Sequence, residues 1–100
     1  MPSMTVKLLP IARDDVDQAL AYIAADNPDA ADALLEDMLK KLAQAAEFPG
    51  SGAEIVVGKR VVRKYHRLCA HPCNILYRIM GDAVLVMRVL RERMDLKGRL

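Results

Sequence analysis

The hydrophobic pattern of this chain changes its period once, at Phe48–Gly52, a segment that contains one proline and two glycines. Before this segment, apolar residues recur every three or four positions, as on an amphipathic helix. After it, apolar and polar residues alternate, as on a strand that buries one face. Clusters of proline and glycine end regular structure. The chain is therefore expected to pack helices from its first half on a sheet from its second half.

The first half predicts one short strand and then a helix. Thr5–Leu9 alternates apolar and polar residues, and Pro10 ends this strand and suits the first turn of a helix. Asp14 and Asp15 are expected near the helix N-terminus, where the helix dipole favours acids. The helix spans Ile11–Ala25, and its apolar stripe consists of Ala12, Val16, Ala19, Leu20 and Ile23.

A second helix is predicted at Ala30–Glu47, with Asn27 as its cap and Pro28 at its first position. The link between the helices is so short that they should form an αα-hairpin. The apolar face of the second helix is wider than one sheet face can cover, and such a surface suits a partner helix. The candidate residues for this contact are Leu34, Leu35, Met38, Leu39 and Leu42.

The second half predicts three strands, at Val61–Leu68, Cys73–Met80 and Ala83–Leu90. Gly81–Asp82 is a signal for a tight turn between the last two. The expected fold class is α+β, with the order β-α-α-β-β-β and a helical hairpin packed on a mainly antiparallel four-stranded sheet. One hundred residues correspond to a single domain over residues 1–100.

Charge is divided unequally along the chain. Residues 1–50 contain nine acids and four bases, whereas residues 51–100 contain four acids and eleven bases, so the formal charges are −5 and +7. Arginines on strands suggest a surface for an anionic partner, such as a phosphate backbone or an acidic protein segment. The alternative is a solvated sheet face whose charges prevent edge pairing.

Two of the strand arginines, Arg78 and Arg88, interrupt otherwise apolar strands. A charge in a buried stretch must be paired or meet something specific. Arg88 could therefore contact a target, or it could form a structural pair with an acid of the first helix such as Asp14 or Asp17. Tyr77 alternates with Ile75 and Ile79 and is expected in the core.

His66 is the strand residue whose pKa suits acid–base work near neutrality. Placed beside Arg67 it could assist RNA cleavage, although a surface histidine without a role is the commoner case.

The segment Cys69–Cys73 offers two cysteines and His71 at alternate positions. Zinc sites usually need four ligands with Cys-x-x-Cys spacing. We therefore expect a loop between two strands, with no metal and no cofactor. No apolar run reaches the roughly 18 residues that span a bilayer, and no secretory signal is recognisable. These features predict a cytoplasmic protein without a membrane partner.

Several stretches together resemble the RelE/ParE superfamily of toxins from bacterial toxin–antitoxin pairs. Pro10–Val16 is similar to the opening helix of that superfamily, and Asn27–Ala31 to its helix junction. Ile75–Ile79 and Val86–Leu90 resemble its last two strands, and Arg93-Met94-Asp95 resembles the ending of the ParE branch. The resemblance covers nearly the whole chain.

The resemblance implies a toxin that a ParD-like antitoxin neutralises, with operator DNA bound only through the antitoxin. ParE-like members inhibit DNA gyrase, whereas RelE-like members cut messenger RNA on the ribosome with a tyrosine or histidine after the last strand. Leu90–Leu96 contains neither residue, which favours gyrase inhibition without catalysis. The expected target-binding residues are Arg63, Arg67, Arg78, Arg88, Arg91 and Arg93.

A ribonuclease is the alternative, in which the phosphate-binding and proton-transfer residues would be Lys64, His66, Arg67 and Arg88. A further alternative is a non-toxic member that only binds an antitoxin-like partner and nucleic acid.

Overall fold

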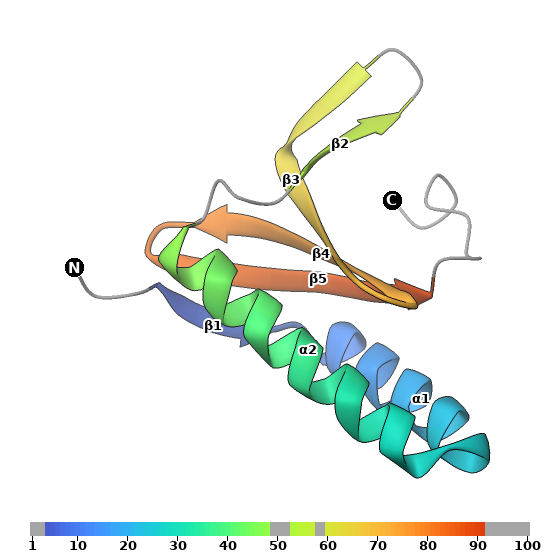
Figure 1. The fold of residues 1–100 in the computed structure, drawn as a ribbon. Coiled ribbons are helices and arrows are strands. Elements are labelled where there is room, and N and C mark those ends of the chain that lie inside the picture. Colours follow the sequence, from blue (N-terminus) through green and yellow to red (C-terminus); the bar gives the residue numbers. More distant parts are fainter. Residues whose placement is uncertain (1–3, 49–52, 58–59, 92–100) are drawn as a thin grey trace.

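A computed structural model describes residues 4–48, 53–57 and 60–91, and for residues 53–57 and 60–64 it describes the backbone alone. Within these residues, two helices lie on one side of a mixed sheet (Figure 1). The elements follow one another along the chain as β1 (Thr5–Leu8), α1 (Pro10–Asp26), α2 (Pro28–Glu47), β2 (Ala53–Val57), β3 (Arg60–Ala70), β4 (Cys73–Met80) and β5 (Ala83–Arg91).

The sheet confirms the predicted α+β class and adds one strand. Its order is β1-β5-β4-β3-β2, in which β1 pairs with β5 in parallel and the other neighbours are antiparallel. The prediction of four strands omitted β2, which pairs with the outer half of β3. The register shifts between Glu54 and Ile55, and a shift of this kind bends a strand pair. The outer ends of β2 and β3 accordingly turn away from the helices (Figure 1).

The two helices begin and end close to where the sequence places them. Asn27 caps α2 as predicted, since its Oδ1 accepts a hydrogen bond from the Ala30 N–H at 3.1 Å, and Pro28 occupies the first turn. The expectation for Asp14 and Asp15 is wrong in detail, because α1 begins at Pro10 and has no acid in its first turn. Neither described helix is long and apolar enough to cross a membrane.

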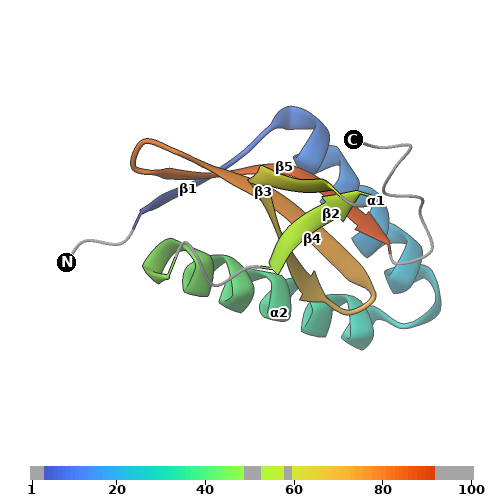
Figure 2. The same ribbon diagram turned by 90° about the horizontal axis from the view of Figure 1, so that it is seen from above.

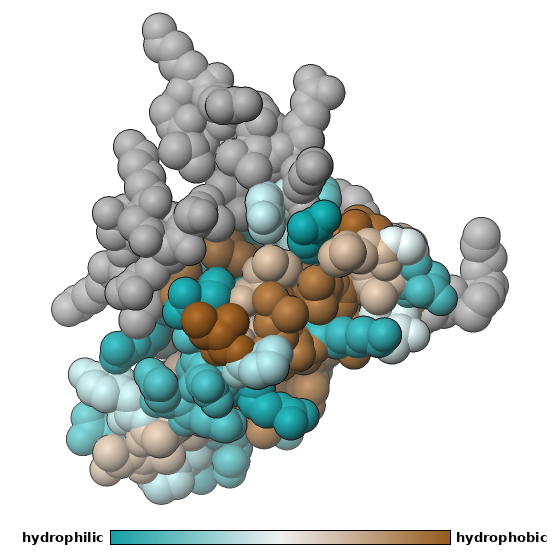
Figure 3. All heavy atoms as spheres, turned by 180° about the vertical axis from the view of Figure 1, so that it is seen from behind, coloured by the Kyte–Doolittle hydropathy of each residue, from teal (hydrophilic) through white to brown (hydrophobic). Residues whose placement is uncertain are grey.

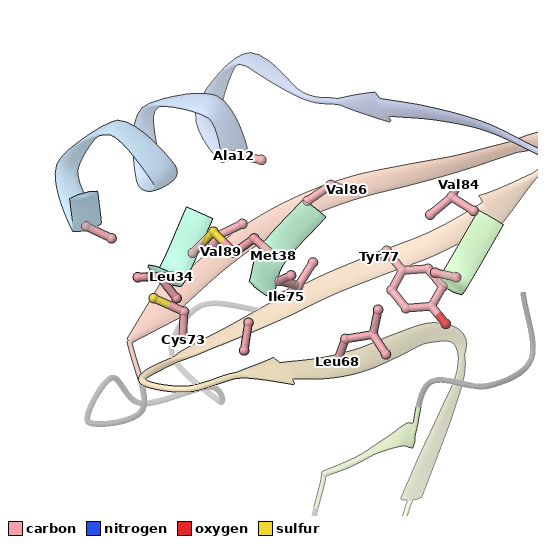
Figure 4. Packing of buried hydrophobic residues seen from close by; sticks show 13 residues of the cluster. Ala12, Leu34, Met38, Leu68, Cys73, Ile75, Tyr77, Val84, Val86 and Val89 are labelled. Carbon is pink, nitrogen blue, oxygen red and sulfur yellow. The ribbon is translucent and has the colours of Figure 1, made fainter. Parts of the chain in front are cut away.

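The core lies between the helical hairpin and the sheet (Figures 2 and 4). Tyr77 is fully buried, as predicted, and lies near Leu68 and Val84 in the close view (Figure 4). The whole predicted stripe of α1 is buried in this core or packed against it. The buried cluster consists of Ala12, Ala19, Leu34, Met38, Ala45, Leu68, Ala70, Cys73, Ile75, Tyr77, Val84, Val86 and Val89.

Candidate functional site

Arg88 is held by a carboxylate of α1. Its Nε donates to Asp15 Oδ2 at 2.7 Å, and its Nη2 donates to Asp15 Oδ1 at 3.0 Å. The backbone N–H of Val89 donates to the same Oδ2 at 3.0 Å. The hydrogen bonds that Arg88 donates to Asp15 raise the pKa of the Arg88 guanidinium, desolvation partly offsets this rise, and the negative charge of Asp15 adds to it. These three residues form what we call the Asp15 clamp.

The clamp is located where the sheet would otherwise leave an open edge. β1 pairs with β5 only from Ala83 to Val86, so β5 continues beyond its parallel partner. α1 lies alongside this second half of β5 (Figures 1 and 2). A buried backbone N–H needs an acceptor, and Asp15 supplies one to Val89. The clamp thus joins the first helix to the last strand.

Part of the expectation for Arg88 is confirmed and part is wrong. An acid of the first helix does pair with Arg88, but it is Asp15 and not Asp14 or Asp17. Successive helix positions are rotated by about 100°, so of Asp14, Asp15 and Asp17 only Asp15 lies on the side of α1 that meets β5. Arg88 is also a weaker candidate for target or phosphate binding than the sequence suggested, because Nε and Nη2 already donate to a carboxylate.

Arg91 lies at the end of β5, next to the clamp. Its guanidinium carbon is 4.7 Å from the centre of the Tyr22 ring on α1, which is within cation–π range. Asp15, Gln18, Ala19, Val89 and Arg91 line a small cavity of about 30 Å³ beside this pair. Sequence reasoning selected Arg91 and missed Tyr22. The available signal was that Tyr22 follows Asp15 by seven residues, which puts both on one side of the helix.

A second group of cations lies on the sheet face that points away from the helices. Arg67 alternates with the buried Leu68 and is exposed on this opposite face. Arg78 is partly buried, and its guanidinium carbon is 6.0 Å from the centre of the Tyr65 ring. Its Nε is buried without a hydrogen-bond acceptor in the part of the chain that the structure describes.

Two other members of the expected target-binding set, Arg63 and Arg93, cannot be placed, since the side chain of Arg63 and all of Arg93 lie outside the described residues.

The four residues of the ribonuclease hypothesis do not come together on one side of the sheet. His66 stacks on the buried Tyr77, with ring centres 5.2 Å apart, so it faces the helical layer. Arg67 points to the other face, and Arg88 is bound in the Asp15 clamp. The side chain of Lys64 lies outside the described residues.

The predicted partner face of α2 divides into buried and exposed residues. Leu34 and Met38 are core residues with 4% and 3% exposure, so they offer no free surface to a partner. Leu42 packs partly against the core. Leu35 and Leu39 are 38% and 58% exposed and stand one helical turn apart. The expectation of an excess apolar face therefore applies to these last two residues.

The segment Cys69–Cys73 crosses from one strand to the next. Cys69 ends up exposed near the end of β3, whereas Cys73 is buried in the core at the start of β4. His71 and Pro72 form the turn and line a mainly apolar hollow of about 410 Å³ together with Leu34 and Asp37. Among the residues that the structure describes, no group of three or more His, Cys, Asp or Glu side chains could hold a metal ion.

Comparison with solved structures places this fold among bacterial toxins. A chain of the chromosomal ParDE TA system from P. aeruginosa has a TM-score of 0.71 and 18% identity, covering 89% of this chain and 96% of that chain. The YoeB/ParE toxin from Agrobacterium tumefaciens has a TM-score of 0.62 and 15% identity, covering 88% and 98%. A chain of the RelBE2 complex from Mycobacterium tuberculosis has a TM-score of 0.59 and 19% identity, covering 90% and 99%.

The class that this architecture defines is therefore the RelE/ParE-like fold of toxin–antitoxin toxins. A sequence profile described as the ParE toxin of the type II toxin–antitoxin system parDE matches residues 6–96. The chain belongs to the ParE toxin family, which confirms the resemblance seen in its sequence, and it is a toxin of a type II toxin–antitoxin system. A search among curated proteins finds no match.

Proposed function

We propose that this toxin acts by binding DNA gyrase and inhibiting it, and that it does not cleave RNA. The main support is the separation of the candidate proton-transfer residues. General acid–base catalysis needs its groups within hydrogen-bond reach of the reacting atoms. His66 faces the helical layer while Arg67 faces the opposite side of the sheet, and Arg88 already donates to Asp15. The absence of tyrosine and histidine from Leu90–Leu96 also favours inhibition by binding.

The proposed target surface is the sheet face that carries Arg67 and Arg78. Neither residue has an ion-pair partner among the described residues. A guanidinium held over an aromatic ring keeps donors available for a carboxylate or a phosphate. The side chains of Arg63 and Arg93 would extend this surface in the proposal. A cognate antitoxin would cover α2 at Leu35 and Leu39, and operator DNA would be bound through that antitoxin.

The test is a supercoiling assay with purified gyrase, ATP and relaxed plasmid. The toxin should inhibit supercoiling or trap cleaved DNA, and addition of antitoxin should restore activity. Arg67→Glu should weaken the inhibition about tenfold, because one charge reversal in an interface costs about 1.4 kcal/mol or more. Lys40→Glu is a matched charge reversal on the exposed side of α2 and should leave the inhibition unchanged.

No effect on gyrase at a large molar excess of toxin would refute the proposal. A parallel assay with translating ribosomes checks the alternative. Cleavage of messenger RNA that disappears in Lys64→Ala/His66→Ala would establish a ribonuclease instead.

A further inference from the structure

Tyr22 of α1 and Arg91 at the end of β5 form a cation–π contact at the surface of the protein. Tyr22 is 68% exposed, yet the Arg91 guanidinium lies 4.7 Å from the centre of its ring. A planar guanidinium that stacks on a ring through its face still has its N–H donors directed outward along its edge. The contact over the ring restrains the position of the Arg91 guanidinium and leaves its N–H donors for another group.

The acid that shares a cavity with Arg91 does not use this edge. Asp15 lines the same small cavity as Arg91, but its two oxygens accept three hydrogen bonds from Arg88 and Val89. No ion pair of Arg91 occurs among the described residues. The cavity of about 30 Å³ has room for a water molecule or two. The Asp15 clamp thus fixes the backbone at Val89, two residues before Arg91, without compensating the charge of Arg91.

We propose that Tyr22 and Arg91 form an anchor for one carboxylate side chain of the cognate antitoxin. Arg91 would bind the carboxylate through two parallel hydrogen bonds, and the exposed ring of Tyr22 would pack against an apolar neighbour of that acid. Tyrosine and arginine are the residue types that most often carry the binding energy of protein interfaces. This site is distinct from the Leu35 and Leu39 surface of α2, and it does not depend on gyrase being the target.

The surroundings of the pair favour a protein segment over a nucleic acid. Asp26 is exposed one helical turn beyond Tyr22, on the same side of α1, and Gln18 lies in the cavity wall. Hydrophilic residues predominate over the end of the helical hairpin in the view from behind (Figure 3). A row of phosphates along this side of α1 would be repelled by Asp26. One carboxylate held by Arg91 presents a single negative charge, and a basic side chain next to it in the antitoxin would complement Asp26.

The test measures the affinity of the full-length toxin for the antitoxin encoded with it, by titration calorimetry at two salt concentrations. Arg91→Gln should weaken binding about 10- to 100-fold, since it removes one partner of a hydrogen-bonded charge pair. Arg91→Lys should recover only part of this loss, because an ammonium lacks the planar fork. Tyr22→Phe should bind within about threefold of the parent, whereas Tyr22→Ala should lose about tenfold through loss of the ring.

Arg13→Gln is the matched control, because it removes the same charge from an exposed position on the same helix. It should bind like the parent. Thermal unfolding of every variant verifies that the fold is kept. Parent-like affinity of both Arg91→Gln and Tyr22→Ala would overturn the proposal.

Two further readouts identify a different use of the pair. If Arg91→Gln keeps its antitoxin affinity but loses binding to a single-stranded oligonucleotide, the anion is a phosphate and the proposal is wrong. If it keeps its antitoxin affinity but loses gyrase inhibition, the pair is a target contact and the proposal is equally wrong. Failure of the parent to inhibit gyrase would bear on the proposed function alone, since the calorimetric assay contains no gyrase.

Discussion

The carboxylate of Asp15 accepts three hydrogen bonds. Asp15 lies where two elements from opposite ends of the chain, α1 and β5, meet. Its side chain is 13% exposed and that of Arg88 is 23% exposed, so water screens the pair only in part. Asp15 follows Ala12 by three residues and precedes Ala19 by four, and both alanines are buried. An acid on the buried side of a helix is a sequence signal for a partner, but the sequence does not say which strand supplies it.

Replacement of Asp15 by asparagine should destabilise the fold. The amide oxygen of the new side chain could accept a hydrogen bond, but the charge of Arg88 would lose its counter-ion, at a cost of about 1–2 kcal/mol in the free energy of unfolding. Asp14→Asn removes an exposed acid at the adjacent position and should change stability by less than about 0.5 kcal/mol. Urea denaturation of both variants measures the difference. Equal stability of the two would contradict a structural role for the clamp.

The pH dependence of this loss follows from the direction of the pKa shift. The pKa of Arg88 is raised on folding, so the stability that this shift contributes is present in full below the ordinary arginine value. It is lost only as the pH rises through the still higher value of the folded state. The difference in unfolding free energy between the parent and Asp15→Asn should therefore be the same at pH 7 and at about pH 10. A marked decrease at about pH 10 would show that Arg88 titrates earlier than its contacts imply.

At the level of elements, the turn between β4 and β5 depends on one glycine. Gly81 has φ +61°, and an added Cβ would meet no atom within 4 Å. Gly81→Ala should therefore lower the free energy of unfolding by about 1 kcal/mol, because alanine adopts a positive φ less readily than glycine and no steric clash adds to this cost. Gly81→Asn should cost less, because asparagine adopts this left-handed conformation more readily. Thermal melts of the two variants provide the comparison, and a larger loss for asparagine than for alanine would contradict this explanation.

The N-terminal cap of α2, Asn27, is correctly predicted from the sequence. Asn27→Ala should lower stability by about 1 kcal/mol, since the Ala30 N–H loses its acceptor. Asn27→Asp should keep most of the parent's stability, because a carboxylate can accept the same hydrogen bond at the favourable end of the helix dipole. Denaturant midpoints of the three proteins test this order.

Local signals explain which elements could be predicted. The two helices, the Asn27 cap and the Gly81 turn depend on residues close together in sequence, and each is recognisable there. Strand β2 was missed because it has five residues and follows a break rich in glycine and proline, although Ile55, Val56 and Val57 favour extended backbone. The choice of Asp15 as the partner of Arg88, and of Tyr22 as that of Arg91, depends on how α1 crosses β5. No periodicity contains that information.

At the level of the whole molecule, the division of charge follows the division into helical and sheet halves. Helix dipoles account for little of the acidic half, because Asp29 is the acid found in the first turn of either described helix. The acids of α1 instead serve the clamp at Asp15 or remain exposed. Two cationic areas then face different directions, one on the sheet face that carries Arg67 and Arg78 and one at the junction of β5 with α1. This arrangement suits a toxin whose antitoxin and target need not occupy the same surface.

Two adjacent residues of α2 separate the stability of this molecule from its proposed binding. Met38 is 3% exposed and Leu39 is 58% exposed. Met38→Ala should cost about 2–4 kcal/mol through loss of buried surface and the cavity left behind, which is a large part of the stability of a domain of this size.

Leu39→Ala should leave the unfolding free energy within about 0.5 kcal/mol of the parent, yet weaken antitoxin binding at least about fivefold if α2 presents Leu35 and Leu39 to the antitoxin. Chemical denaturation and calorimetric titration of the same two preparations measure both quantities. Leu39→Ala that binds the antitoxin like the parent would remove α2 from the proposed interface, while the Tyr22 and Arg91 anchor, on the other helix, would remain to be judged by its own variants.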